Sequence, residues 1–136
     1  MIGRATDESS PLMQSLGNGR LVEYSAADKR AVMEFTARPE FCHSGNVVQG
    51  GFVTAWIDSA MAHATMLATD GELAPSTLEI KVSFFRAANP GLVRAEASVE
   101  RLGRSIAFLG GRLTTPDGEV LATATSTVKL VPTRRT

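Results

Sequence analysis

One carboxylate stands alone in a long apolar stretch. Between Glu40 and Asp70, Asp58 is the only charged residue. A carboxylate that is buried without partners is costly, so Asp58 needs hydrogen-bond donors or a function. Burial raises the pKa of a carboxyl group and donors lower it, which suits a general base or a nucleophile. A satisfied aspartate inside a helix, bonded to Thr54 or Ser59, is the structural alternative.

A glycine-rich loop leads into this stretch. Gly50 and Gly51 stand where the apolar run begins, and the first N–H groups of a helix have no partner within it. Such groups, at the positive end of the helix dipole, can hold an anion or a developing oxyanion. A tight, closely packed helix start is the structural alternative. A phosphate-binding loop is excluded, because Gly51 and Phe52 follow Gly50 where that motif requires Lys and then Ser or Thr.

Gly50 and Asp58 are too far apart to act together in one chain. Eight helical residues correspond to about 12 Å along the axis and roughly 80° around it. If two copies pack these helices side by side and antiparallel, Gly50 of one copy faces Asp58 of the other, which gives two equivalent sites about a two-fold axis. The spacing therefore favours composite sites in a homodimer.

The elements that must position these residues form an α+β pattern. Residues 50 to about 69 leave almost no polar face, which is typical of a buried helix. Four successive strands after the helix favour an antiparallel meander. The predicted strands, two short ones before the helix and four long ones after it, cover residues 20–25, 31–36, 78–85, 93–100, 105–114 and 120–131.

Two details of the strands bear on packing. Leu78, Ile80, Val82 and Phe84 alternate with other residues, which predicts one shared buried face. The glycine pair at 110–111 predicts a bulge or a close backbone approach. One sheet cannot cover every side of the helix, so the pattern also predicts a partner surface, and therefore at least a dimer.

Length and composition limit the class of protein. The 136 residues predict an arm over 1–19 and a single domain over 20–136. Fourteen Lys and Arg balance fourteen Asp and Glu without a basic run, so no nucleic-acid partner is expected. One cysteine and two histidines are too few for a zinc site or an internal disulfide. No secretory signal or membrane span is recognisable, which predicts a cytoplasmic protein.

The segment HSGNVVQGG-x6-D, from His43 to Asp58, resembles the signature of hotdog-fold acyl-CoA thioesterases of the phenylacetic-acid-degradation type. The family pattern is usually His-Gly-Gly, followed by a catalytic Asp or Glu seven residues after the second glycine. The resemblance covers roughly residues 15–131. It implies a hotdog fold, with an antiparallel sheet wrapped around a long central helix, in a homodimer or a dimer of dimers without a metal or redox cofactor.

The resemblance also implies roles for particular residues. Asp58 is expected to be the base or nucleophile on the thioester, and the Gly50 N–H is expected to polarise its carbonyl. His43 is expected beside that carbonyl, and Thr77 is expected to position the attacking water. The substrate-binding set consists of Gln49, Gly51, Arg86, Arg104 and Ser105, in which the two arginines meet the phosphates of coenzyme A or are ordinary solvated side chains.

Gln49 replaces the histidine that usually precedes the two glycines. Glutamine donates and accepts hydrogen bonds but cannot ionise, so any role that needs an imidazole is lost. A non-catalytic module that binds or senses acyl-CoA is therefore one alternative. A hydratase or dehydratase with His43 as its acid or base is another. Cys42 is predicted to be a plain thiol and His63 a packing residue.

Overall fold

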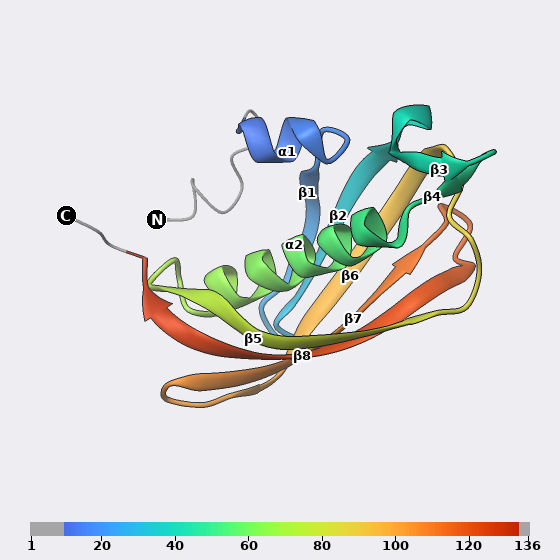
Figure 1. Ribbon diagram of the computed structural model, residues 1–136. Helices are drawn as coiled ribbons and strands as arrows, with labels where there is room; N and C mark the ends of the chain where they lie inside the picture. The colour runs from blue at the N-terminus through green and yellow to red at the C-terminus, as the bar shows by residue number, and fades with distance from the viewer. Residues whose placement is uncertain (1–9, 134–136) are drawn as a thin grey trace.

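The computed structural model of the chain describes residues 10–133. A strongly curved antiparallel sheet wraps around one long helix, and a short helix lies near one end of the sheet (Figure 1). This arrangement confirms the predicted hotdog fold. The elements are α1 (Pro11–Ser15), β1 (Arg20–Ser25), β2 (Arg30–Ala37), a 3-10 turn (Pro39–Phe41), β3 (Cys42–Ser44), β4 (Val47–Val48), α2 (Gly50–Ala68), β5 (Leu73–Phe84), β6 (Gly91–Leu102), β7 (Ile106–Thr114) and β8 (Val120–Pro132).

The six long strands follow the order β1-β2-β6-β7-β8-β5, and β3 and β4 form a separate small ribbon. The predicted meander of four strands is therefore wrong for β5, which pairs with β8 and not with β6. In the observed order β6 pairs with β2, and β5 lies at the far edge of the sheet beside β8. Placing β6 between β2 and β7 joins all six strands into one sheet beneath α2.

The long helix α2 packs closely against the sheet. Trp56, Ile57 and Met61 on its inner side are almost completely buried. A Cβ atom on Gly111 of β7 would lie 2.9 Å from Cγ2 of Ile57, so only glycine lets the helix come this close. The glycine pair at 110–111 therefore marks a close approach, and the bulge in the β6–β7 ladder lies elsewhere, between Val99 and Arg101.

A bulge interrupts the edge strand β5. Its pairing with β8 shifts by one residue between Thr77 and Glu79. An extra residue on one strand changes which side chains face each side of the sheet. Leu78 lies at this shift and is 57% exposed, so the prediction that it shares a buried face with Ile80 is wrong. β5 also begins five residues earlier than predicted, and it accommodates Pro75 because an edge strand needs fewer N–H donors.

The N-terminal part of the chain packs onto the domain. Met13 and Leu16 are buried in the main core. The indole Nε1 of Trp56 donates a hydrogen bond to the main-chain oxygen of Leu16 at 2.7 Å. The predicted arm over 1–19 is thus held against α2 from residue 10 onward, and residues 1–9 and 134–136 of the predicted arm and domain lie outside the described part.

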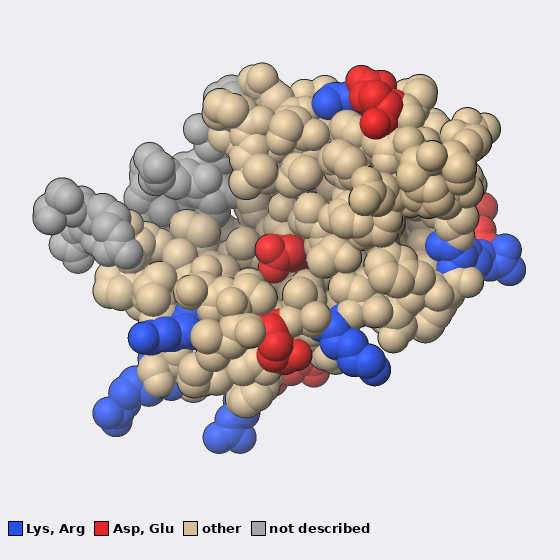
Figure 2. All heavy atoms as spheres, viewed as in Figure 1, with Lys and Arg blue, Asp and Glu red and all other residues tan. Residues whose placement is uncertain are grey.

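Charged side chains are distributed unevenly over the surface. The face that carries α2 is largely free of them, and they gather towards the rim of the molecule (Figure 2). No helix within residues 10–133 is long and apolar enough to cross a bilayer. The helix face thus resembles a protein contact surface more than a solvated one.

Replacing Trp56 with Phe tests the link between α1 and α2. The change leaves the buried Leu16 carbonyl without its indole donor, so we expect the free energy of unfolding to fall by about 1–3 kcal/mol. Urea denaturation measures the change. Leu12→Ala, at an exposed position of the same short helix, is the control and should change stability by less than about 0.5 kcal/mol. Equal effects of the two changes would contradict this assignment.

Candidate active site

The middle of α2 carries Asp58, which is half-buried and faces the edge strand. The hydroxyl of Thr77 on β5 donates a hydrogen bond to Oδ1 of Asp58 at 3.3 Å. The partners considered from the sequence are wrong: the Thr54 hydroxyl donates to the Gly50 carbonyl of its own helix, and no described hydrogen bond joins Ser59 to Asp58. The carboxylate therefore depends on a strand that lies 19 residues further along the chain.

Two opposing effects set the pKa of Asp58. Burial raises the pKa above the ordinary value of an aspartate, and the hydrogen bond from Thr77 lowers it in part. The net result is a raised pKa. A carboxylate of this kind is a stronger base than a free one, and it can take a proton from a water molecule or attack an electrophile directly.

The start of α2 forms the second part of the site. The N–H groups of Gly50 and Gly51 donate to no main-chain acceptor within residues 10–133, which leaves them available to an oxyanion. The ring of Phe84 closes one side, because a Cβ on Gly50 would lie 3.2 Å from its Cζ. Phe84 is nonetheless 54% exposed. The sequence predicted Phe84 as part of a buried face and missed its place beside the helix start.

A cavity of about 380 Å³ opens in front of this helix start. His43 on β3 is exposed, and its Nδ1 lies 3.0 Å from Oγ of Ser44. The small ribbon that carries His43 is tied to the loop after β5 by a hydrogen bond from Val48 N to Ala88 O at 2.9 Å. The cavity is mostly apolar, and its lining consists of His43, Val47, Val48, Gly50, Val53, Phe84, Phe85, Arg86, Ala87 and Ala88.

Gln49 and Gly51 flank Gly50 and are both exposed. Gln49 occupies the cap position of α2, but its side chain makes no capping hydrogen bond. A Cβ on Gly51 would meet no atom within 4 Å. Neither residue is required by packing within the chain, so both remain free for a ligand or for another copy of the chain.

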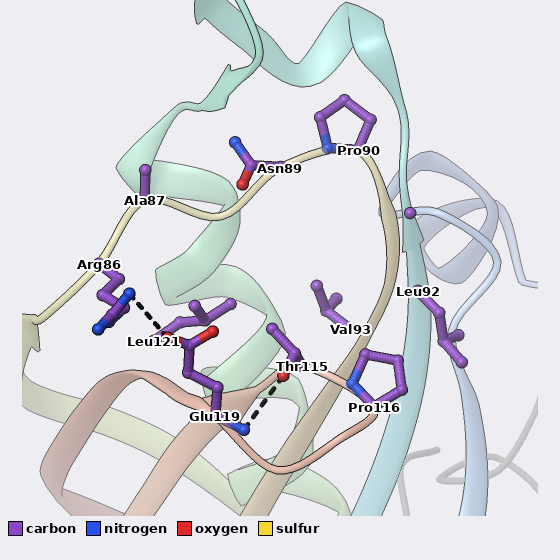
Figure 3. Close-up of a pocket in the computed structure, with 11 residues that line it drawn as sticks. Arg86, Ala87, Asn89, Pro90, Leu92, Val93, Thr115, Pro116, Glu119 and Leu121 are labelled. Atoms are coloured by element: carbon purple, nitrogen blue, oxygen red, sulfur yellow. Dashed lines mark hydrogen bonds and ion pairs between the residues drawn. The ribbon is translucent and has the colours of Figure 1, made fainter.

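Arg86 lies at the rim of the cavity. Its Nη1 forms an exposed ion pair with Oε2 of Glu119 at 2.8 Å. Beyond this pair lies a second cavity of about 570 Å³, between the loop after β5 and the β7–β8 turn. Figure 3 shows Pro90 and Pro116 on its walls and Leu121 among its lining residues. Glu119, which neutralises Arg86, was not among the residues predicted for the site.

One chain does not bring all of the predicted site residues together. Gly50 and Asp58 lie on the same helix at the predicted separation, and the cavity at the helix start does not include Asp58. Arg104 and Ser105 lie in the β6–β7 turn, whereas Arg86 precedes β6. The 12 residues of β6 span about 40 Å. The two arginines therefore lie near opposite ends of β6 in one chain.

The remaining chemically interesting side chains take no part in the cavity. His63 is buried, its Nδ1 lies 2.8 Å from the Ser59 carbonyl, and burial lowers its pKa. It is a packing residue, as predicted. Cys42 is a half-buried free thiol. Within residues 10–133, no group of three or more His, Cys, Asp or Glu side chains could hold a metal ion.

Known proteins share both the family pattern and the fold. The thioesterase superfamily matches residues 45–122. The phenylacetic acid degradation-related protein of Ralstonia eutropha JMP134 is 28% identical, with a TM-score of 0.83 over 94% of this chain and 98% of that one. A variant of PaaI from Thermus thermophilus is 27% identical, with a TM-score of 0.75 over 88% and 98%. PaaI of E. coli, at 17% identity and a TM-score of 0.82 over 95% and 90%, shares the fold. No curated protein matches the sequence.

The family match covers more than half of the chain. It includes both the glycines at the start of α2 and Asp58 in the middle of the helix, which are the two parts of the candidate site. The chain therefore belongs to the thioesterase superfamily, as a hotdog-fold thioesterase of the phenylacetic-acid-degradation type.

Proposed function

We propose that the protein hydrolyses an acyl-CoA thioester to the free acid and coenzyme A, in composite sites at the interface of a homodimer. The observation that carries this proposal is the pair formed by Asp58 and Thr77, a half-buried carboxylate with one hydroxyl donor. Asp58 lies on the same helix as the N–H groups of Gly50 and Gly51, but too far from them to serve one carbonyl. A second copy of the chain supplies the missing half.

The free edge of β5 is the surface on which we place the second copy. Residues 73–78 of this strand carry no charge, and their outer edge has no partner strand within the described chain. The opposite edge, β1, carries Arg20 and Glu23 and is short and bulged, features that discourage strand pairing. Antiparallel pairing of two β5 edges continues the sheet and turns Asp58 of one helix towards the helix start of the other.

The chemistry follows from these positions. The Gly50 N–H of one subunit, with His43 beside it, donates to the thioester carbonyl oxygen and stabilises the oxyanion that forms. Asp58 of the other subunit takes a proton from a water molecule as that water attacks the carbonyl carbon. The C–S bond then breaks, and coenzyme A leaves as a thiolate, which takes the proton that Asp58 received from the water and so regenerates the carboxylate. Direct attack by Asp58, with an anhydride that water later opens, uses the same residues.

Coenzyme A itself supplies the charge that Arg86 is suited to bind. A phosphate that displaces Glu119 gives Arg86 a stronger, bidentate partner. Arg104 and Ser105 then contact the ligand from a different subunit, because the length of β6 separates them from Arg86 in one chain. Contributions from several subunits suit a dimer or a dimer of dimers. The proposed coenzyme A ester substrate is compatible with the predicted cytoplasmic location.

Replacing Asp58 with Asn tests whether this carboxylate carries the reaction. Asparagine keeps the size of the side chain but can neither accept the proton nor attack, so we expect thiol release from acyl-CoA esters to fall by several orders of magnitude. A thiol-reactive dye measures the release across aryl, short, medium and long acyl groups. Ser59→Ala, at the next position of α2, is the control and should retain activity. Binding of coenzyme A esters without any turnover by the wild type would favour the binding module.

Mixing two inactive variants tests the composite site. Asp58→Asn and His43→Ala subunits carry different tags and are co-expressed, so that random pairing makes half of the dimers mixed. Each mixed dimer has one intact site, and the preparation should therefore show about a quarter of wild-type activity. If mixed dimers are isolated through both tags and remain inactive, the two residues act within one chain and the composite site is wrong.

The pH dependence of hydrolysis tests the role of Thr77. Asp58 must be ionised to act, so activity should rise with pH through the raised pKa of its carboxyl group. Thr77→Val removes the donor that lowers this pKa, so the acid side of the profile should move to higher pH. Initial rates at saturating substrate across the acidic range measure the shift. Thr125→Ala on β8 is the control, and an unchanged profile for Thr77→Val would contradict the contact.

A further inference from the structure

Three polar side chains are buried within residues 10–133: His63, Thr65 and Ser126. The first two bond to carbonyls four residues earlier in α2, which is how an isolated polar group in a helix satisfies itself. Ser126 differs, because its hydroxyl crosses from β8 to β5 and donates to the main-chain oxygen of Glu79 at 2.8 Å. It is 3% exposed. A buried hydroxyl that joins two strands constrains their relative position.

Ser126 occupies a position that would otherwise be apolar. The side chains of β8 that face α2 alternate along the strand, and apart from Ser126 they are Ala122, Ala124, Val128 and Leu130. An alanine at position 126 would fit this pattern and would bury no hydroxyl. The polar residue stands instead where β8 passes the bulge of β5, opposite Ile80.

The bulge allows two sets of β5 side chains to face the helix. Thr77 pairs with Val128 and Ile80 pairs with Ser126, and both partners are buried on the helix side of β8. In a regular strand, residues 77 and 80 would lie on opposite faces. Without the extra residue Leu78, either Thr77 would turn away from Asp58 or Ile80 would turn away from the core.

Glu79, the residue that follows the bulge, accepts one hydrogen bond on each side of the sheet. On the inner side, Ser126 bonds to the main-chain oxygen of Glu79. On the outer side, the hydroxyl of Thr127 donates to Oε2 of Glu79 at 2.7 Å. These two contacts fix the register at which β5 leaves the bulge, and Thr77 lies only two residues earlier.

We propose that Ser126 is a positioning residue of the active site, which anchors the β5 bulge and thereby aims Thr77 at Asp58. This inference rests on the proposed function, because the chemical role of Asp58 comes from that proposal. The described hydrogen bond of Ser126 goes to Glu79 and not to Asp58, and Ser126 does not line the cavity, so it acts through the main chain of Glu79 and the side chain of Thr77. The contact from Thr77 to Asp58 is 3.3 Å, long enough that a small movement of the bulge breaks it.

The test compares kcat, KM and the pH profile of Ser126→Ala with the wild type, with palmitoyl-, hexanoyl- and phenylacetyl-CoA as the thioester probes. Loss of the anchor should lower kcat by about 3- to 10-fold, the usual worth of one hydrogen bond, and should leave KM unchanged. The acid side of the profile should move to higher pH, as for Thr77→Val. Ser126→Thr keeps the hydroxyl and should restore the wild-type profile.

Two comparisons separate this inference from a purely structural role and from failure of the proposed function. The double variant Ser126→Ala, Thr77→Val should be no worse than Thr77→Val alone, because both changes break the same contact. Additive losses, or a changed melting temperature with an unchanged pH profile, would overturn the positioning role. If Asp58→Asn retains full activity, the proposed function itself is wrong, whereas an inactive Asp58→Asn beside a Ser126→Ala with wild-type kinetics overturns this inference alone.

Discussion

The packing of α2 into the curve of one sheet is the constraint on which the rest of the structure depends. The helix is apolar on nearly every side, yet a single layer of strands covers only its inner face. Close packing there requires Gly111, because any side chain would push Ile57 away. The outer face has few charges around it (Figure 2), which suits the second copy of the chain that we propose. The candidate site is incomplete in one chain as well, because the Asp58 carboxylate and the Gly50 N–H lie too far apart on α2 to serve one carbonyl.

Burial of the ionised Asp58 side chain among these apolar residues costs free energy. Its raised pKa shows that the folded chain holds the ionised carboxylate less favourably than water does. By linkage, the contribution of this group to stability is greatest below the ordinary pKa of an aspartate and is lost as the pH rises through the raised value. A residue that served packing alone would not be charged here. Proteins accept such local costs at functional sites, where a basic carboxylate is useful.

The elements that follow from local periodicity and turn residues could be predicted from the sequence. The buried helix over residues 50–69, the short strands before it and the turn after β7 follow from periodicity and turn residues, and the separation of Gly50 from Asp58 follows from helix geometry. The order of the strands could not be predicted, because no local pattern says that β5 pairs with β8. The hydrogen-bond partner of Asp58 could not be predicted from the pattern either, because Thr77 lies on a different element. Thr77 entered only through the family resemblance, and Glu119 was missed because a cross-loop ion pair leaves no sequence signal.

The β5 bulge shows why a local pattern misleads at a functional site. The alternation that begins at Leu78 holds only for Ile80 and Val82, which lie after the bulge and pack against the core. Before the bulge, the alternation runs through odd positions and brings Thr77 to the helix. In a regular strand, either Ile80 would face the core and Thr77 would turn away from Asp58, or Thr77 would face Asp58 and Ile80 would turn away from the core. The extra residue, Leu78, lets both side chains face the helix. Because the bulge is on an edge strand, it leaves the rest of the sheet undisturbed. The site is therefore built from a deviation in the register of the sheet and not from a motif on α2 alone.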